Sequence, residues 1–183
     1  MDIAALVISG LAAVIAGIGT ILANRRANEA LRESRRATAT ALWSALQEAV
    51  QRLVGFDPSA EPVGERLANL RIAAIALADE YTEWEGLDAW LESERVLGAT
   101  LGRQVMDAAQ PGDTVERRLK VLDPLMSWAH AFSQNLRLFR NSGYDRQTLS
   151  KLQMHAADLT RSISERHGWE SPRTSNPRLS TLD

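Results

Sequence analysis

The sequence predicts an all-α protein in which an N-terminal transmembrane helix continues into a stalk helix and then a four-to-five-helix cytoplasmic bundle. Three observations predict this class. Residues 3–23 form a run of 21 uncharged residues, and as a helix this run would rise about 31 Å, close to the thickness of a bilayer core. Beyond it, apolar residues recur at steps of three and four. No segment shows the alternation of apolar and polar residues that is typical of a half-buried strand.

The predicted transmembrane helix, residues 3–23, contains ten large aliphatic residues and eleven small ones. A cleaved signal peptide and a long buried core helix are the alternatives. No Lys or Arg precedes the run, which is longer than a signal-peptide core of about 7–15 residues, and Arg25 and Arg26 follow it directly. These features favour a permanent membrane anchor.

The flank that follows the anchor predicts its orientation. Five arginines stand there against only two glutamates, and the other flank has no basic residue. The five are Arg25, Arg26, Arg32, Arg35 and Arg36. Because basic flanks stay on the cytoplasmic side, we expect the N-terminus outside and everything from Arg25 onward in the cytoplasm. The same arginines are candidates to pair with anionic lipid headgroups of the cell membrane.

Two features suggest self-association. Ser9, Ala13 and Gly17 recur every four residues, and such a row of small residues lets two helices approach closely in lipid. The predicted stalk, residues 24–55, has a weak heptad-like pattern that improves from Leu42 onward, as in a short coiled coil. We therefore list a homodimer through the anchor and stalk among the possible partners, beside membrane lipid and an unknown protein.

The junction of anchor and stalk also carries a resemblance. The apolar N-terminus running into the basic segment 24–36, NRRANEALRESRR, is similar to uncharacterised single-pass membrane proteins of high-GC Gram-positive (actinobacterial) type. The resemblance covers at most the first third of the chain and implies a similar architecture. It implies no known activity, and no functional residue carries over from it.

Residues 56–168 are expected to form the soluble helical bundle. After a proline-containing loop over 56–62, the patterns predict helices over about 63–81, 87–109, 113–140 and 145–168. We expect Thr82 and Glu85 to form a capping box, and Pro124 to kink or restart its helix with Asp123 as cap. Gly143 and Gly168 are expected to end the last two helices. Residues 169–183, rich in Ser, Pro, Thr and Arg, are predicted to be disordered.

The composition excludes several kinds of chemistry. Absence of cysteine excludes disulfides, thiol nucleophiles and thiolate metal sites, and a net charge of −2 argues against a nucleic-acid partner. No phosphate-binding loop or nucleophile elbow occurs, so no catalytic, cofactor or metal site is predicted. His155 and Asp158 are three residues apart and could share a helix face and bind a metal together with a third ligand. Solvated or packing roles are expected for both. The acidic stretch 79–94 is interpreted as a solvated turn and the start of a helix. The alternatives are a patch for a basic partner and a cation site.

The leading functional prediction is a membrane-anchored cytoplasmic interaction or scaffold protein without enzymatic activity. One alternative is a small-molecule sensor or enzyme with a site in the bundle core, and another is an accessory subunit of a larger membrane complex. A sensor requires a concave pocket with converging polar side chains, whereas a scaffold requires apolar residues left outside the core. Trp43, Trp84 and Trp169 are the candidates for such exposed residues.

Overall fold

The computed structural model describes residues 3–55, 63–110 and 112–170, and of residues 3–23 it describes the backbone alone. Over these ranges the chain forms five helices and no strand, which confirms the all-α prediction. The helices are α1 (Ile3–Val54), α2 (Gly64–Glu80), α3 (Leu87–Ala108), α4 (Val115–Ser142) and α5 (Arg146–His167). Their bounds lie within a few residues of the predicted ones, because the glycines and prolines that interrupt the periodic segments are local signals.

Helix α1 runs without interruption from Ile3 to Val54, as the lack of Pro and Gly between Gly19 and Gly55 predicts. The chain divides into two compact units, residues 1–41 and 42–183, so the boundary falls inside this helix. Side chains 24–38 are all exposed, whereas Trp43, Leu46, Val50 and Leu53 are buried. The second half of the predicted stalk is thus part of the bundle, because its apolar stripe has helical neighbours to pack against.

Within the part of the chain that the structure describes, no helix is both long and apolar enough to cross a membrane. The side chains of residues 3–23 lie outside the described residues. The transmembrane helix therefore stays a prediction from the sequence.

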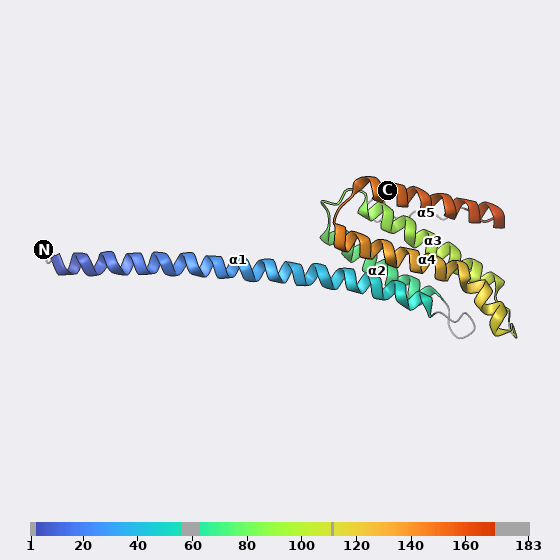
Figure 1. Ribbon diagram of the computed structural model, residues 1–183, viewed down its shortest axis with the longest axis horizontal. Helices are drawn as coiled ribbons and strands as arrows, with labels where there is room; N and C mark the ends of the chain where they lie inside the picture. The colour runs from blue at the N-terminus through green and yellow to red at the C-terminus, as the bar shows by residue number, and fades with distance from the viewer. Residues whose placement is uncertain (1–2, 56–62, 111, 171–183) are drawn as a thin grey trace, which may run out of the picture. The chain divides into compact units, whose positions relative to one another are not determined.

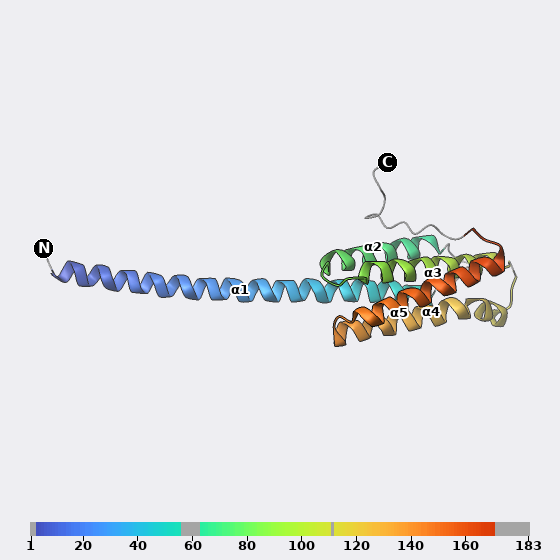
Figure 2. The same ribbon diagram turned by 90° about the horizontal axis from the view of Figure 1, so that it is seen from above.

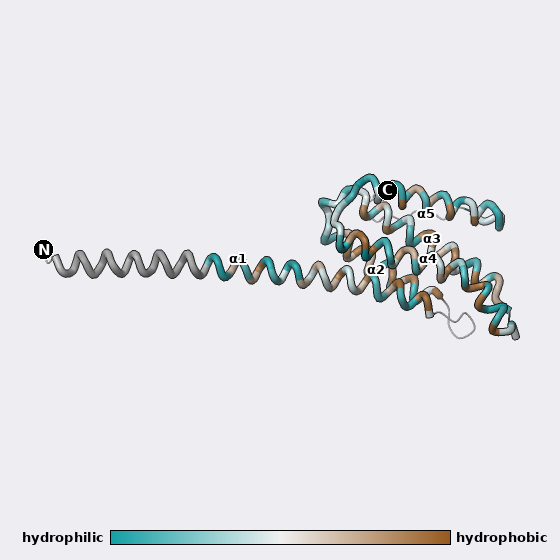
Figure 3. Tube along the Cα trace, viewed as in Figure 1, coloured by the Kyte–Doolittle hydropathy of each residue, from teal (hydrophilic) through white to brown (hydrophobic). Residues whose placement is uncertain are grey.

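Helix α3 is the centre of the bundle and packs against α2, α4 and α5 (Figures 1 and 2). Along these helices apolar residues alternate with hydrophilic ones at helical spacing (Figure 3). In α4, five apolar side chains that recur at steps of three and four residues are buried: Leu125, Trp128, Phe132, Leu136 and Phe139. In α5, Leu149, Ala156 and Ile163 are buried, whereas Leu159 is 40% exposed.

The helix ends follow local backbone chemistry in most places. The Asp145 carboxylate caps α5 by accepting hydrogen bonds from the backbone N–H groups of Gln147 and Thr148. Gly168 ends that helix with a left-handed φ of 65°, and Gly143 ends α4 with a φ of 83°, as predicted. The N-cap of α4 is Thr114, whose hydroxyl oxygen accepts a hydrogen bond from the backbone N–H of Arg117.

One predicted helix start is wrong, and at Pro124 one of the two predicted alternatives is excluded. Residues Thr82 and Glu85 form no capping box, because α3 begins after Gly86, which has a φ of 89° and makes no side-chain cap. The left-handed glycine reverses the chain and lets Trp84 pack against the core. This turn takes the place of the predicted capping box. Helix α4 also does not restart at Asp123. It continues through Pro124, since packing of the long apolar stripe outweighs the lost hydrogen bond.

An aromatic cluster of Trp43, Tyr81, Trp84 and Tyr144 joins the N-terminal parts of the bundle to its last loop. The Trp43 indole N–H donates to the Tyr81 hydroxyl at 3.0 Å, and the ring centroids of Tyr81 and Trp84 lie 4.9 Å apart. Trp43 is only 3% exposed and Trp84 is half-buried. The prediction that these tryptophans remain outside the core is therefore wrong.

The predicted disordered tail starts one or two residues too early. Trp169 is half-buried, its backbone N–H donates to the Ser164 carbonyl, and the Arg103 guanidinium lies 4.2 Å from its ring centroid. Its ring also stacks on His167. The rest of the predicted tail, residues 171–183, lies outside the described residues, as does the predicted loop 56–62.

Candidate functional site

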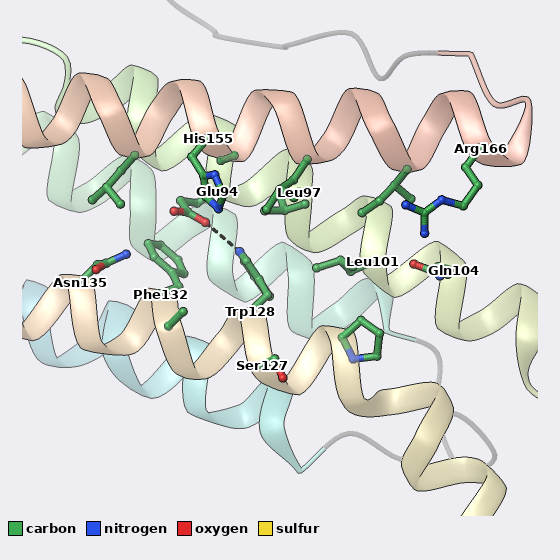
Figure 4. Close-up of a pocket in the computed structure, with 16 residues that line it drawn as sticks. Glu94, Leu97, Leu101, Gln104, Ser127, Trp128, Phe132, Asn135, His155 and Arg166 are labelled. Atoms are coloured by element: carbon green, nitrogen blue, oxygen red, sulfur yellow. Dashed lines mark hydrogen bonds between the residues drawn. The ribbon is translucent and has the colours of Figure 1, made fainter.

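A cleft of about 410 Å³ opens between α4 and α5, with α3 as its floor (Figure 4). Its walls are mainly apolar and aromatic, and they include Leu97, Leu101, Phe132, Ile163 and the ring of Trp128. A small number of polar side chains enter it from the three helices: Glu94, Gln104, Ser127, Asn135, His155 and Arg166. This combination of an apolar wall and a few polar groups is typical of small-molecule sites.

Glu94 is the central polar group of the cleft. It lies on α3, is only 6% exposed, and accepts hydrogen bonds from two tryptophans. The Trp90 indole N–H donates to Oε1 at 3.0 Å, and the Trp128 indole N–H donates to Oε2 at 2.7 Å. Each carboxylate oxygen therefore has one neutral donor, which holds the group in a single orientation.

The sequence of α3 explains how a carboxylate reaches this position. Glu94 stands three residues after Leu91 and three before Leu97, so it occupies the apolar stripe of the helix. The next position on this face is Gly98, where an added Cβ would lie 2.3 Å from the Trp128 ring. The absence of a side chain at Gly98 thus makes room for the indole that donates to Glu94.

Burial raises the pKa of Glu94, because the low-dielectric surroundings disfavour its charged form. The two indole donors, and then the nearby His155, act in the opposite direction and lower this pKa. Within the described residues, no Lys, Arg or His forms an ion pair with Glu94. The carboxyl group is therefore oriented by the two indole dipoles, and no ion pair among the described residues neutralises it.

The rim of the cleft carries two basic side chains, both exposed. His155 on α5 lies beside Glu94, while Arg166 lies at the other end of the cleft near Gln104 (Figure 4). Leu97 and Leu101 line the floor between these two ends. The cleft therefore offers an elongated apolar surface with a buried acidic group at one end and a solvated basic group at the other.

The residues predicted to act at the membrane surface are not part of this cleft. Arg25, Arg26, Arg32, Arg35 and Arg36 all have exposed side chains on α1, in the unit that contains residues 1–41. The predicted helix contact of Ser9, Ala13 and Gly17 falls on side chains outside the described residues.

The acidic stretch 79–94 does not behave as one surface. Glu85 pairs with Arg146 at 2.6 Å and Glu92 pairs with Arg95 at 2.7 Å, whereas Glu94 turns into the core. The interpretation of the whole stretch as solvated is therefore wrong at Glu94. Tertiary packing of α4 and α5 over α3 covers that residue.

The pair His155 and Asp158 is also separated in role. Asp158 forms an ion pair with Arg161 at 3.1 Å, while His155 lines the cleft. Among the described residues, no group of three His, Asp or Glu side chains could hold a metal ion.

Sequence reasoning missed Glu94 because it was grouped with its acidic neighbours. The available signal was its register: a glutamate interrupts the stripe of Leu87, Leu91, Leu97 and Leu101, and Trp90 stands four residues before it. The second donor, Trp128, is 34 residues away and has no local signal. Comparison of the chain with protein-family models, with curated proteins and with solved structures gave no match.

Proposed function

We propose that this protein is a membrane-tethered small-molecule sensor whose ligand binds in the cleft of α3, α4 and α5. The observation that carries the proposal is the oriented, unneutralised carboxylate of Glu94 in an apolar cleft of about 410 Å³. A volume of this size is in the range of about 300–1,000 Å³ that is usual for ligand pockets. A carboxylate is costly to bury without a charged partner, which favours a binding role over a purely structural one.

The scaffold prediction receives less support from the described residues. The tryptophans that it needs on the surface are packed, with Trp43 and Trp84 in one aromatic cluster and Trp169 against Arg103. Polar side chains converge on a concave site instead, which is the arrangement that a sensor requires.

Binding in the cleft can be tested with a neutral aromatic probe, neopentylbenzene, on the full chain in lipid nanodiscs. The readout is the ¹H–¹⁵N signal of the Trp128 indole, which reports directly on the bond to Glu94. We expect saturable shifts that disappear in Ala131→Trp, where the new ring fills the cleft. The matched control is Ala157→Trp, on an exposed face of α5 away from the cleft. Equal shifts in both variants would contradict binding in the cleft.

The membrane tether is proposed from the sequence of residues 3–23 and the arginines that follow. The chain has no cysteine, so the variant Thr40→Cys carries a single thiol at an exposed position. A membrane-impermeant thiol reagent can then be added to either side of sealed vesicles. We expect labelling from the cytoplasmic side, and altered labelling when Arg25 and Arg26 are both replaced by Glu. Unchanged labelling, or recovery of the full chain in the aqueous fraction, would contradict the tether.

A second candidate function is self-association through the face formed by α1 and α2. A groove there is lined by Leu42, Ala45, Ala49, Ala73 and Ala76, and Ile72 beside it is 66% exposed. Small residues let helices of a second copy approach closely, and the groove uses the heptad-like half of α1. An Ile72→Cys variant should then form a disulfide-linked dimer on oxidation, whereas Ser150→Cys on α5 should not. Equal crosslinking of both variants would count against this face.

A further inference from the structure

Among the described residues no ion pair gives Glu94 a counter-ion, and this arrangement specifies the ligand that the cleft would select. Glu94 is 6% exposed and makes two hydrogen bonds, both from neutral indole groups. Such donors satisfy oxygen lone pairs, but they leave the net charge of a carboxylate in place. A ligand that brings a positive charge to this position would therefore gain an attraction that is weakly screened by solvent.

The basic side chains of the rim do not supply that charge. Arg166 lies at the far end of the cleft, beyond Leu101 (Figure 4). His155 is the group that faces Glu94 from α5, and its exposed side chain lowers the pKa of Glu94 less than either indole does. The polar side chains that α4 contributes to the cleft, Ser127 and Asn135, are uncharged. The acidic character of this end of the cleft therefore persists.

Aromatic rings beside the carboxylate favour the same ligand charge. Trp128 and Phe132 both line the cleft, and they stack with ring centroids 5.7 Å apart and planes inclined by 25°. The faces of aromatic rings carry partial negative charge and attract organic cations, the indole of Trp most strongly. The remaining wall, with Leu97, Leu101 and Ile163, matches an apolar body attached to the cationic group.

We propose that the cleft recognises lipophilic organic cations, in which a quaternary or protonated amine pairs with Glu94 beside Trp128 and an aromatic or aliphatic body covers the apolar wall. This inference rests on the proposed sensor function and names its ligand class. Apolar clefts accept neutral molecules in general, so the specific claim is the preference for positive charge at one end.

Three probes of nearly equal shape separate charge from shape: benzyltrimethylammonium, the neutral neopentylbenzene and the anionic phenylmethanesulfonate. Each is titrated into the full chain in zwitterionic-lipid nanodiscs at one fixed pH of about 8, so that only the charge of the probe varies. The Trp128 indole signal gives each affinity. We expect the cation to bind at least about tenfold more tightly than the neutral probe, and the anion more weakly than either.

The variant Glu94→Gln removes the charge and keeps the shape of the side chain. We expect it to bring cation and neutral probe to within about twofold of each other, while the neutral probe still binds. Continued binding of the neutral probe shows that the cleft of this variant is folded. The matched control is Glu83→Gln, an exposed carboxylate outside the cleft, which should leave the cation preference unchanged.

The outcomes separate the two proposals. Equal affinity for cation and neutral probe, a preference for the anion, or a cation preference that survives in Glu94→Gln would each overturn the cation inference while the sensor function stands. Failure of all three probes to shift the indole signal would overturn both. If Glu94→Gln does not fold, the neutral variant Glu94→Met replaces it, and a cation preference that survives there would also overturn the inference.

Discussion

The bundle contains two tryptophan sites that are alike in burial and differ in what their indoles bind. Trp43 donates to a neutral hydroxyl, that of Tyr81, within a closely packed aromatic cluster. Trp90 and Trp128 donate to the carboxylate of Glu94 at the floor of an open cleft. The first arrangement involves neutral groups alone, whereas the second places an ionisable carboxyl group, itself 6% exposed, at the wall of a cleft.

This difference teaches how to tell a structural polar contact from a candidate site. In the Trp43 cluster every group is neutral, so packing alone accounts for it. At Glu94, burial raises the pKa, and no ion pair among the described residues offsets the desolvation of its charged form. The cost of this desolvation is understandable if a ligand occupies the cleft during function.

The largest effect is expected from closing the space under Trp128. In Gly98→Ala the new Cβ would lie 2.3 Å from the Trp128 ring, so the indole must move and its bond to Glu94 is lost. Overpacking and the lost charged hydrogen bond should together reduce the free energy of unfolding by about 3 kcal/mol, measured by urea denaturation. The control is Gly102→Ala, whose Cβ would meet Val63 at 3.2 Å and Leu67 at 3.5 Å, and which should change stability much less. Equal losses in both variants would refute the special role of Gly98.

A smaller, paired effect compares the two indole donors directly. Trp128→Phe leaves a buried carboxylate oxygen without its donor, and we expect a loss of about 1.5–3 kcal/mol in the free energy of unfolding. Trp43→Phe leaves the half-buried, neutral Tyr81 hydroxyl without its indole donor. We expect the loss of this hydrogen bond to lower the free energy of unfolding by about 0.5–1.5 kcal/mol. Both variants lose similar ring volume, so their difference reports the charge of the acceptor. A larger loss at Trp43 would remove the distinction between the two sites.

The pH dependence of stability should distinguish the sites as well. Because the folded pKa of Glu94 lies above its ordinary value of 4.5, its contribution to stability is fully present below that pH and is lost as pH rises through the folded pKa. The stability of Glu94→Gln relative to that of wild type should therefore increase as the pH rises above about 4.5. Thermal melts at several pH values measure this, with Glu83→Gln as control. A difference that stays constant with pH would contradict a raised pKa.

The smallest effect is expected at the surface ion pair that joins the start of α5 to the turn before α3. Arg146 and Glu85 approach to 2.6 Å, but their side chains are 68% and 67% exposed. Solvent screens such a pair, so Arg146→Ala should change the free energy of unfolding by at most about 1 kcal/mol and leave probe binding unchanged. A larger loss would mean that the Trp84 region depends on this pair for its position.

Most of the helix positions can be predicted from local sequence signals. The four helices of 63–168 appear at the predicted places because glycine, proline and capping residues restrict the backbone locally. Asp145, Gly143 and Gly168 act as their chemistry predicts. The stripe of α4 is equally local, since a period of 3.6 residues needs no knowledge of the partner helix. Where two local signals compete, as at Pro124 and Thr82, packing decided which one prevailed.

What tertiary structure alone decided is which side chains meet. Register places Glu94 on the apolar face of α3, but only the approach of α4, 34 residues later, brings Trp128 to its oxygen. The burial of Trp43 depends in the same way on Tyr81, 38 residues along the chain. The local sequence determines how each helix forms and which of its faces is apolar. The site requires three helices to converge, and that convergence comes from burying all their faces together.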